Sequence, residues 1–197
     1  MIRIILLFIF IPSIASSQTE IKIHFLYGSK PAKGFKQSES KLFGGIKGGH
    51  VNIELNGQFL DFMPGDCPLL PERKNPSGGF HINNSVYWDP DSDKWATVTV
   101  PVTNEQVKSL KDLFDAYAKK SPYDYAVFGM RCAAASYDVL SEIGLMKKIS
   151  NSNNVIKHFY PKLLRKKIFK WAEKNNYAIT YHDGKSTRKW EKDSGPF

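Results

Sequence analysis

One of the two cysteines in this 197-residue chain, Cys132, stands where a thiol can be chemically activated. Residues 133–143 repeat apolar side chains at helical spacing and Gly144 offers a left-handed stop, so a helix is predicted to begin at the sulfur. The positive end of the helix dipole and the neighbouring Arg131 both favour a thiolate there. The chemistry this permits is nucleophilic attack by sulfur. The alternative is that Cys132 is a small core residue that only packs the helix.

A hairpin predicted around Asn56 and Gly57 offers a base for this thiol. An Asn-Gly dipeptide between two apolar-rich runs indicates a two-residue turn, so the flanking residues pair as antiparallel strands. In the predicted register, counted away from the turn, these residues stand opposite each other on the two strands: Glu54 and Phe59, Ile53 and Leu60, Asn52 and Asp61, Val51 and Phe62, and His50 and Met63. Because directly opposed side chains share a face, the hairpin has one apolar and one polar face.

The polar face of this hairpin gathers His50, Asn52 and Asp61. Asp61 lies diagonally from His50 at about 7–8 Å between backbones, so its carboxylate can reach an imidazole nitrogen. The core face is expected to carry Val51, Ile53, Leu55, Leu60 and Phe62. A second strand histidine, His81 in a short strand predicted at residues 80–82, is a rival base.

The cysteines have a further possible use as a structural bridge. Cys67 lies in a proline-rich loop at residues 64–77, and it forms an even pair with Cys132. In an oxidising compartment the two can close as a disulfide, which removes the nucleophile. Sequence spacing does not fix the distance between the sulfurs, so both states stay open at this point.

Residues 1–17 predict such a compartment. A basic Arg3, an apolar run at residues 4–11 and small residues at 15–17 form the pattern of a secretory signal peptide. The run is short for a membrane anchor, which is the weaker alternative, and no later segment is long enough to span a bilayer. The apolar content of 42% supports a folded core, so residues 18–197 are expected to form one exported domain, periplasmic or extracellular.

The net charge of +9 is concentrated near the C-terminus. Between residues 157 and 192, eleven Lys and Arg stand against three Asp and Glu. A helix predicted to begin at Pro161 carries five of these charges on its expected surface: Lys162, Arg165, Lys166, Lys167 and Lys170. The charge favours an anionic partner such as phospholipid or a cell-wall polymer, or else a solvated helix without a partner. Nucleic acid is disfavoured, because no recognition motif accompanies the charge.

The remaining elements are expected to position these residues. Alternating apolar residues predict a strand at 20–27, and further strands are expected at 85–88, 95–102 and 177–181. Thr103 and Gln106 form a capping box for a helix at residues 104–120. Residues 150–154, SNSNN, are interpreted as a linker, and the residues after 181 as a polar tail.

Several standard motifs are missing from the sequence, including GxSxG, HExxH, paired CxxC and the dinucleotide fingerprint. We therefore expect neither a metal nor a cofactor. What remains is a thiol at a helix start, a strand histidine and a polar residue on the histidine's face. Nucleophilic thiol catalysis needs this set, and the helix start supplies donors for an oxyanion.

This order of residues resembles the circularly permuted papain-like group, which includes permuted NlpC/P60-type proteins and lecithin:retinol acyltransferase-like enzymes. The resemblance rests on GGHV in one strand, a polar residue in the next, and a Tyr-containing turn into a Cys-headed helix, over roughly residues 47–144. It implies an α+β fold in which a small antiparallel sheet packs against helices. It also implies that His50 is the base, Asp61 the orienting residue and Cys132 the nucleophile, with support from Tyr125. Members of the group often have Asn before the cysteine, where this chain has Arg131.

For an exported protein, the resemblance implies a cysteine amidase or peptidase that acts on cell-wall peptides or other amide bonds. Lipid ester hydrolysis or acyl transfer is a second expectation, favoured by the amphipathic basic helix after Pro161. The third is a secreted binding protein without catalysis, in which Cys67 and Cys132 are joined and the basic segment holds an anionic partner.

Overall fold

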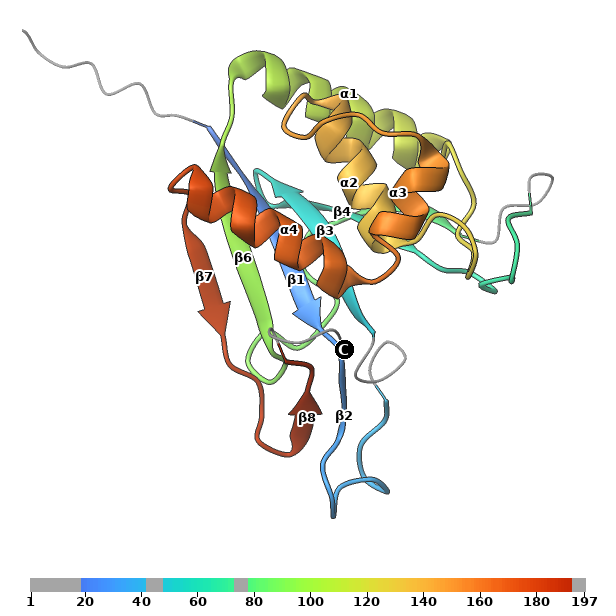
Figure 1. The fold of residues 1–197 in the computed structure, drawn as a ribbon, viewed down its shortest axis with the longest axis vertical. Coiled ribbons are helices and arrows are strands. Elements are labelled where there is room, and N and C mark those ends of the chain that lie inside the picture. Colours follow the sequence, from blue (N-terminus) through green and yellow to red (C-terminus); the bar gives the residue numbers. More distant parts are fainter. Residues whose placement is uncertain (1–18, 42–47, 73–77, 193–197) are drawn as a thin grey trace, which may run out of the picture.

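A computed structural model describes residues 19–41, 48–72 and 78–192, so the signal peptide predicted at residues 1–17 lies outside the described residues. The described chain is α+β, with a six-stranded antiparallel sheet and four helices (Figure 1). The strand order is β5-β4-β3-β1-β6-β7. The bounds are β1 Glu20–Tyr27, β3 Gly49–Leu55, β4 Gln58–Met63, β5 Gly79–Asn83, β6 Trp95–Pro101 and β7 Ile179–His182.

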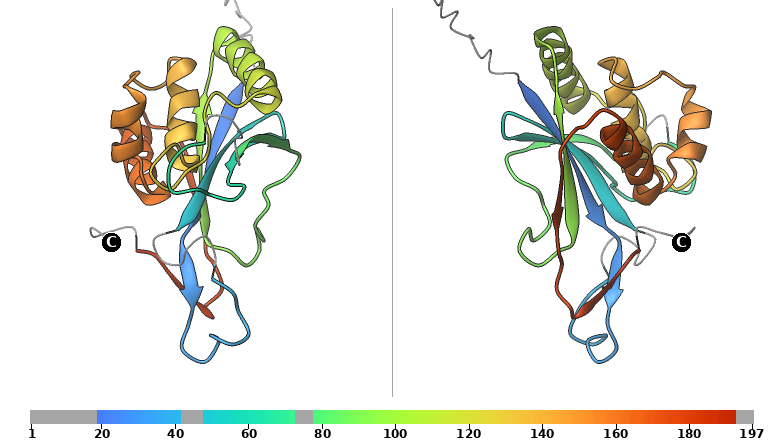
Figure 2. Two further views of the ribbon diagram at one scale, coloured as in Figure 1. Left: turned by 90° about the vertical axis from the view of Figure 1, so that its right-hand side faces the viewer. Right: turned by 60° about the vertical axis from the view of Figure 1, so that its left-hand side comes forward.

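The helices pack on the apolar face of the sheet, and Figure 2 shows α2, α3 and α4 together on one side. Their bounds are α1 Asn104–Lys119, α2 Cys132–Glu142, α3 Asn151–Lys157 and α4 Pro161–Lys174. The predicted core face of the hairpin is confirmed, because all five of its apolar side chains are at most 2% exposed. Leu140 of α2 and Leu164 and Ile168 of α4 complete this core. In the part of the chain that is described, no helix is long and apolar enough to cross a membrane.

The helix ends follow local sequence signals. The Thr103–Gln106 capping box is present in both directions, and Pro161 stands in the first turn of α4. Helix α2 begins at Cys132 as predicted, and Gly144 after its end has φ +77°. The linker predicted at residues 150–154 is wrong, because Ser150 caps α3 by accepting a hydrogen bond from the Asn153 backbone N–H.

Three further predictions about the strands and the C-terminal tail need correction. Residues 85–88 form no strand; the side chain of Trp88 is instead buried and lies edge-on to the ring of Trp95. The expected polar tail contains β8 (Arg188–Trp190), which pairs with β2 (Ser29–Pro31) in a second, two-stranded sheet. The last strand of the main sheet begins at Ile179, two residues later than expected.

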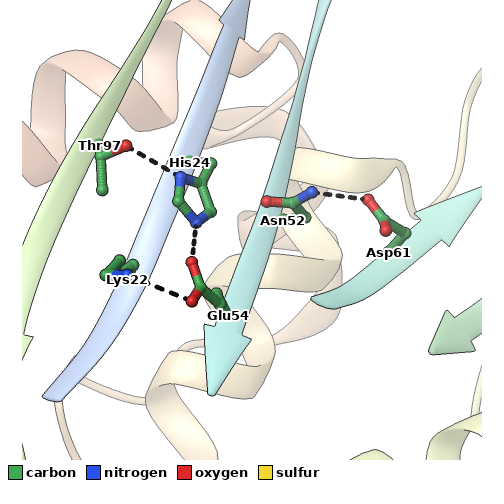
Figure 3. Close-up of polar contacts among 6 residues, drawn as sticks. All are labelled: Lys22, His24, Asn52, Glu54, Asp61 and Thr97. Atoms are coloured by element: carbon green, nitrogen blue, oxygen red, sulfur yellow. Dashed lines mark hydrogen bonds and ion pairs between the residues drawn. The ribbon is translucent and has the colours of Figure 1, made fainter. Parts of the chain in front are cut away.

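The β3–β4 hairpin has the predicted register only near its turn. Asn56 and Gly57 have φ of 51° and 79°, as a two-residue turn requires, and the predicted pairs form from Leu55 with Gln58 to Asn52 with Asp61. The ladder ends there, so the predicted pairs Val51–Phe62 and His50–Met63 are wrong. Strand β4 turns away with β5, and Figure 3 shows β3 and β4 diverging.

The basic face predicted for α4 is only partly exposed. Lys166, Lys167 and Lys170 are exposed, but Lys162 and Arg165 are only 5% and 1% exposed. For Arg165 the physical reason is the return of the chain after β8, which places the carboxylate of Glu191 2.7 Å from Nη1 of Arg165 inside the protein. The prediction that all five charges lie on the surface is therefore wrong for these two residues.

Candidate active site

Helix α2 meets the sheet where β3 and β4 part. The backbone N–H of Val51 donates to the sulfur of Cys132, and Ser136 Oγ donates to the carbonyl of Val51 at 3.4 Å. Cys132 and Ser136 are four residues apart and therefore lie on the same helix face. Two side chains of α2 thus take the hydrogen bonds that a strand partner of Val51 would make. These two hydrogen bonds hold the Cys132 sulfur, which comes from the helical side, at the point where β3 and β4 separate.

The path of the chain into His50 depends on glycine. Gly49 has φ +100°, and a Cβ at this position would lie 2.4 Å from the carbonyl oxygen of Leu26. The ring of His50 is 3% exposed, hydrogen-bonds to Cys132, and places Nε2 3.0 Å from Oδ1 of Asp61. Because Nε2 is directed at the carboxylate, Nδ1 is the nitrogen left for the sulfur. Cys132, His50 and Asp61 therefore form a continuous hydrogen-bonded series.

Asp61 is fully buried and is held by three donors. Besides His50, these are Nδ2 of Asn52 at 3.0 Å and Nδ2 of Asn83 at 2.8 Å. Figure 3 shows the amide nitrogen of Asn52 directed at the carboxylate. Burial raises the pKa of Asp61, but the hydrogen bond with His50, its positive charge and the two amide donors outweigh burial, so the pKa is lowered. The Asp61 carboxylate is therefore ionised at neutral pH.

The thiol and the imidazole shift each other's titration. Burial opposes ionisation of Cys132, yet the charge and hydrogen bond of His50, the charge of Arg131 and the Val51 N–H together lower its pKa. Burial also opposes protonation of His50, but the Cys132 thiolate and the Asp61 carboxylate raise its pKa to about 9. The favoured state near neutral pH is therefore a thiolate–imidazolium pair.

The start of α2 offers hydrogen-bond donors beside the sulfur. Arg131, the N-cap residue, makes no side-chain capping bond, and the first turn has no acidic residue. The Ala135 N–H bonds to the carbonyl of Arg131, so the N–H groups before it, including that of Cys132, have no partner within the helix. Such groups can stabilise an oxyanion on a carbon attached to the sulfur.

Tyr125 lies beside the same site. Its hydroxyl accepts a hydrogen bond from Arg131, its ring stacks on Phe62 at 5.3 Å, and the residue is 8% exposed. Burial and then the negative charge of Cys132 raise the pKa of Tyr125, which places its hydroxyl within electrostatic reach of the sulfur. The hydroxyl stays protonated and can donate.

An aromatic cover over His50 is missed by sequence reasoning. The ring of Tyr87 meets the His50 ring edge-on at 5.0 Å, and Trp88, 5% exposed, lies 6.4 Å from it. Both residues come from the loop between β5 and β6, which crosses the sheet face opposite the helices (Figure 2). Adjacent Tyr and Trp are the available signal, but residues 85–88 are expected from the sequence to form a strand. The cover shields the His50–Asp61 hydrogen bond from water.

The alternatives to this site can be compared directly. His81 stands opposite Asp61 in the β4–β5 ladder, but its side chain is exposed, and the imidazole that hydrogen-bonds to Cys132 is that of His50. Cys67 and Cys132 are both free thiols, so the disulfide expected of a purely structural pair is not formed. The sulfur of Cys132 is therefore available for chemistry.

A second histidine cluster lies on the same sheet face (Figure 3). Nδ1 of His24 is 2.9 Å from Oγ1 of Thr97, and Nε2 is 2.8 Å from Oε2 of Glu54, which also pairs with Lys22. Burial lowers the pKa of His24, so its ring is neutral and serves as a hydrogen-bonded link between strands. No group of three or more His, Cys, Asp or Glu in the described ranges is placed to hold a metal ion.

An open groove of about 1470 Å³ runs along the protein next to the start of α2. It reaches within two residues of Cys132 through Met130, and it includes Phe128 and Ile156, which are 63% and 73% exposed. Large apolar side chains exposed beside a reactive group commonly mark a binding surface. The groove is therefore a place for a substrate to lie.

Comparisons with protein-family models, curated proteins and solved structures give no match to this chain. The geometry of the site is therefore the basis for a functional assignment.

Replacing Asp61 with asparagine is expected to lower the pKa of His50. The carboxylate stabilises the imidazolium by a hydrogen bond and by its charge, and asparagine removes the charge. An NMR titration of the imidazole resonances measures the change. His158, whose pKa burial lowers to about 4, serves as the internal reference and should not move. An unchanged His50 titration in the variant would contradict stabilisation of the imidazolium by Asp61.

Proposed function

We propose that the protein is a cysteine hydrolase that cleaves amide or peptide bonds. Cys132 is the nucleophile, His50 is the acid and base, and Asp61 orients the imidazole. The observation that supports this most strongly is the hydrogen-bonded series from the sulfur to Asp61 at an uncapped helix start. Histidine on a strand, ahead of cysteine at a helix start, also agrees with the resemblance to the permuted papain-like group.

Acylation begins from the ion pair. The Cys132 thiolate attacks the carbonyl carbon, a C–S bond forms, and the carbonyl oxygen becomes an oxyanion held by the N–H groups at the start of α2. The imidazolium of His50 then gives its proton to the leaving amine as the C–N bond breaks. The products of this half are a thioester on Cys132, a free amine and a neutral imidazole.

Deacylation reverses the roles. The neutral His50 takes a proton from water, and the oxygen of that water attacks the thioester carbonyl. The C–S bond breaks, a carboxylic acid leaves, and the sulfur and imidazole return to the ion pair. Asp61 stays ionised throughout and keeps Nε2 protonated, so Nδ1 can exchange the proton.

Peptides of the cell wall are the substrates that fit an exported amidase, and they are the leading assignment within this proposal. Lipid ester hydrolysis or acyl transfer is the second candidate, and the apolar groove beside α2 favours it because such a surface suits an alkyl chain. Attraction to an anionic surface now rests on Lys166, Lys167 and Lys170, since Lys162 and Arg165 are buried. Parallel assays on peptidoglycan fragments and phospholipid esters separate the two candidates.

Alkylation of the purified protein by iodoacetamide tests the nucleophile. At pH 6, Cys132 is expected to react about tenfold faster than Cys67, because its thiolate is stabilised by His50. Peptide mass spectrometry measures the two thiols in the same sample, so Cys67 serves as the matched control. A Cys132 that reacts no faster than Cys67 contradicts the proposed function.

A further inference from the structure

The residue before the nucleophile carries a positive charge that is held by aromatic groups. The guanidinium of Arg131 lies 4.6 Å from the centre of the Phe159 ring and 5.5 Å from that of Tyr160. It also donates to the hydroxyl of Tyr125. These contacts fix the guanidinium beside Cys132 without neutralising it.

The other arginines of the described ranges are used differently. Nη1 of Arg165 is 2.7 Å from a carboxylate oxygen of Glu191, and Nη1 of Arg188 is 2.9 Å from one of Glu39. For Arg131, by contrast, no carboxylate among the described residues lies at ion-pair distance. A guanidinium has five N–H donors, and a hydroxyl acceptor and two rings leave most of them unused. Arg131 is half-buried, so a ligand can reach it.

We propose that Arg131 binds a carboxylate of the substrate next to the scissile carbonyl. The inference rests on the proposed function and narrows its substrate class to amides or peptides with a free carboxylate near the cleaved bond. The planar guanidinium matches a carboxylate with two parallel hydrogen bonds. Because the rings already hold it in place, binding loses little side-chain entropy. The imidazolium of His50 adds to the positive potential at the same point.

Two alkylating reagents test this inference without knowledge of the natural substrate. Iodoacetate and iodoacetamide both react as the thiolate attacks the CH₂ carbon, a C–S bond forms and iodide leaves. They differ only in carrying a carboxylate or a neutral amide. The measured quantity is the ratio of their rates at Cys132, iodoacetate over iodoacetamide, in the purified protein. Division by the iodoacetamide rate removes any effect of Arg131 on the thiolate itself.

In Arg131→Gln the ratio is expected to fall about tenfold, because a hydrogen-bonded charge pair with the reagent is lost. Arg131→Lys keeps the charge but lacks the planar guanidinium. Its ratio should lie between that of the unmodified protein and that of Arg131→Gln. Lys111→Gln removes an exposed charge on α1, outside the groove lining, and is the matched control, with an unchanged ratio expected. Near-UV circular dichroism verifies that each variant is folded, and Arg131→Lys provides the comparison if the glutamine variant is not.

The outcomes separate this inference from the proposed function. An unchanged ratio in folded Arg131→Gln, or in Arg131→Lys if the glutamine variant does not fold, with Cys132 still more reactive than Cys67, overturns carboxylate binding and leaves the nucleophile in place. Equal reactivity of Cys132 and Cys67 toward both reagents in the unmodified sequence overturns the proposed function itself. If the ratio falls as expected, paired peptide substrates ending in a carboxylate or in a carboxamide should differ in kcat/KM in the same direction.

Discussion

Replacing His50 with glutamine is expected to lower kcat/KM for amide hydrolysis by about 10³- to 10⁴-fold. Glutamine cannot carry the positive charge that stabilises the Cys132 thiolate, and it cannot protonate the leaving amine. The amide can still hydrogen-bond to Asp61, so the fold should be retained. Steady-state hydrolysis of peptidoglycan fragments, with Cys132→Ala as the inactive reference, measures the effect.

The pH profile gives this prediction a second readout. In the unmodified sequence, activity should fall at low pH as the thiolate is protonated, and again through about pH 9 as the imidazolium loses its proton. In His50→Gln, the acidic limb of Cys132 alkylation should move to higher pH, because the charge that lowers the thiol pKa is gone.

His81→Gln is the matched control for this experiment, since His81 is exposed and its substitution should leave the alkylation of Cys132 unchanged. Loss of activity in His81→Gln with activity retained in His50→Gln would reverse the assignment of the base.

The hairpin shows how far local sequence determines the site. The turn residues Asn56 and Gly57 fix the register over the four pairs up to Asn52–Asp61, and the face that gathers His50 with Asp61 follows from strand alternation. The end of the ladder beyond Asn52 was not predictable in this way. It depends on α2, whose Cys132 and Ser136 bind Val51 from more than eighty positions along the chain. The hydrogen bond between Cys132 and His50 depends on this long-range contact between α2 and β3.

The groups that surround the site were predicted least well, for the same reason. Asn83 reaches Asp61 through the pairing of β4 with β5. The register of this pair cannot be predicted from the sequence, because 15 residues connect the two strands and no short turn fixes it. Residues 85–88 are expected from the sequence to form a strand, but the rings of Tyr87 and Trp88 pack over His50 instead. In each case the tertiary contact decides the structure, and no local propensity specifies it.

The C-terminal segment is the clearest case of a local pattern that tertiary structure overrides. Periodicity places Arg165 next to the apolar stripe of α4, where a long cation is expected to reach solvent. The structure instead closes a buried cluster over it. The guanidinium lies 3.6 Å from the centre of the Tyr27 ring, and Oε1 of Glu191 accepts from both Arg165 and the Gly28 N–H, at 2.7 and 3.1 Å. The positive charge of Arg165, which is expected from the sequence on an anion-binding surface, thus makes contacts that link α4 to β1 and to the chain after β8.

Replacing Arg165 with methionine is therefore expected to lower the free energy of unfolding by about 3–5 kcal/mol. The variant leaves the Glu191 carboxylate buried, with only the Gly28 N–H as a hydrogen-bond donor among the contacts given above, and it removes the cation from the Tyr27 ring. Urea denaturation followed by circular dichroism measures the change, which should appear as a lower midpoint at an unchanged slope.

Lys170→Met is the matched control, because it makes the same substitution at an exposed position of the same helix and should change stability by no more than about 0.5 kcal/mol. Equal midpoints for the two variants would contradict a buried ion pair. The double variant Arg165→Met, Glu191→Met distinguishes the net contribution of the ion pair to stability from the cost of leaving one charge buried without its partner. Removing both charges avoids an unpaired carboxylate. Recovery of most of the lost stability in the double variant is expected. It would mean that the Arg165–Glu191 pair specifies how the C-terminal chain docks on α4 and β1 more than it stabilises the fold.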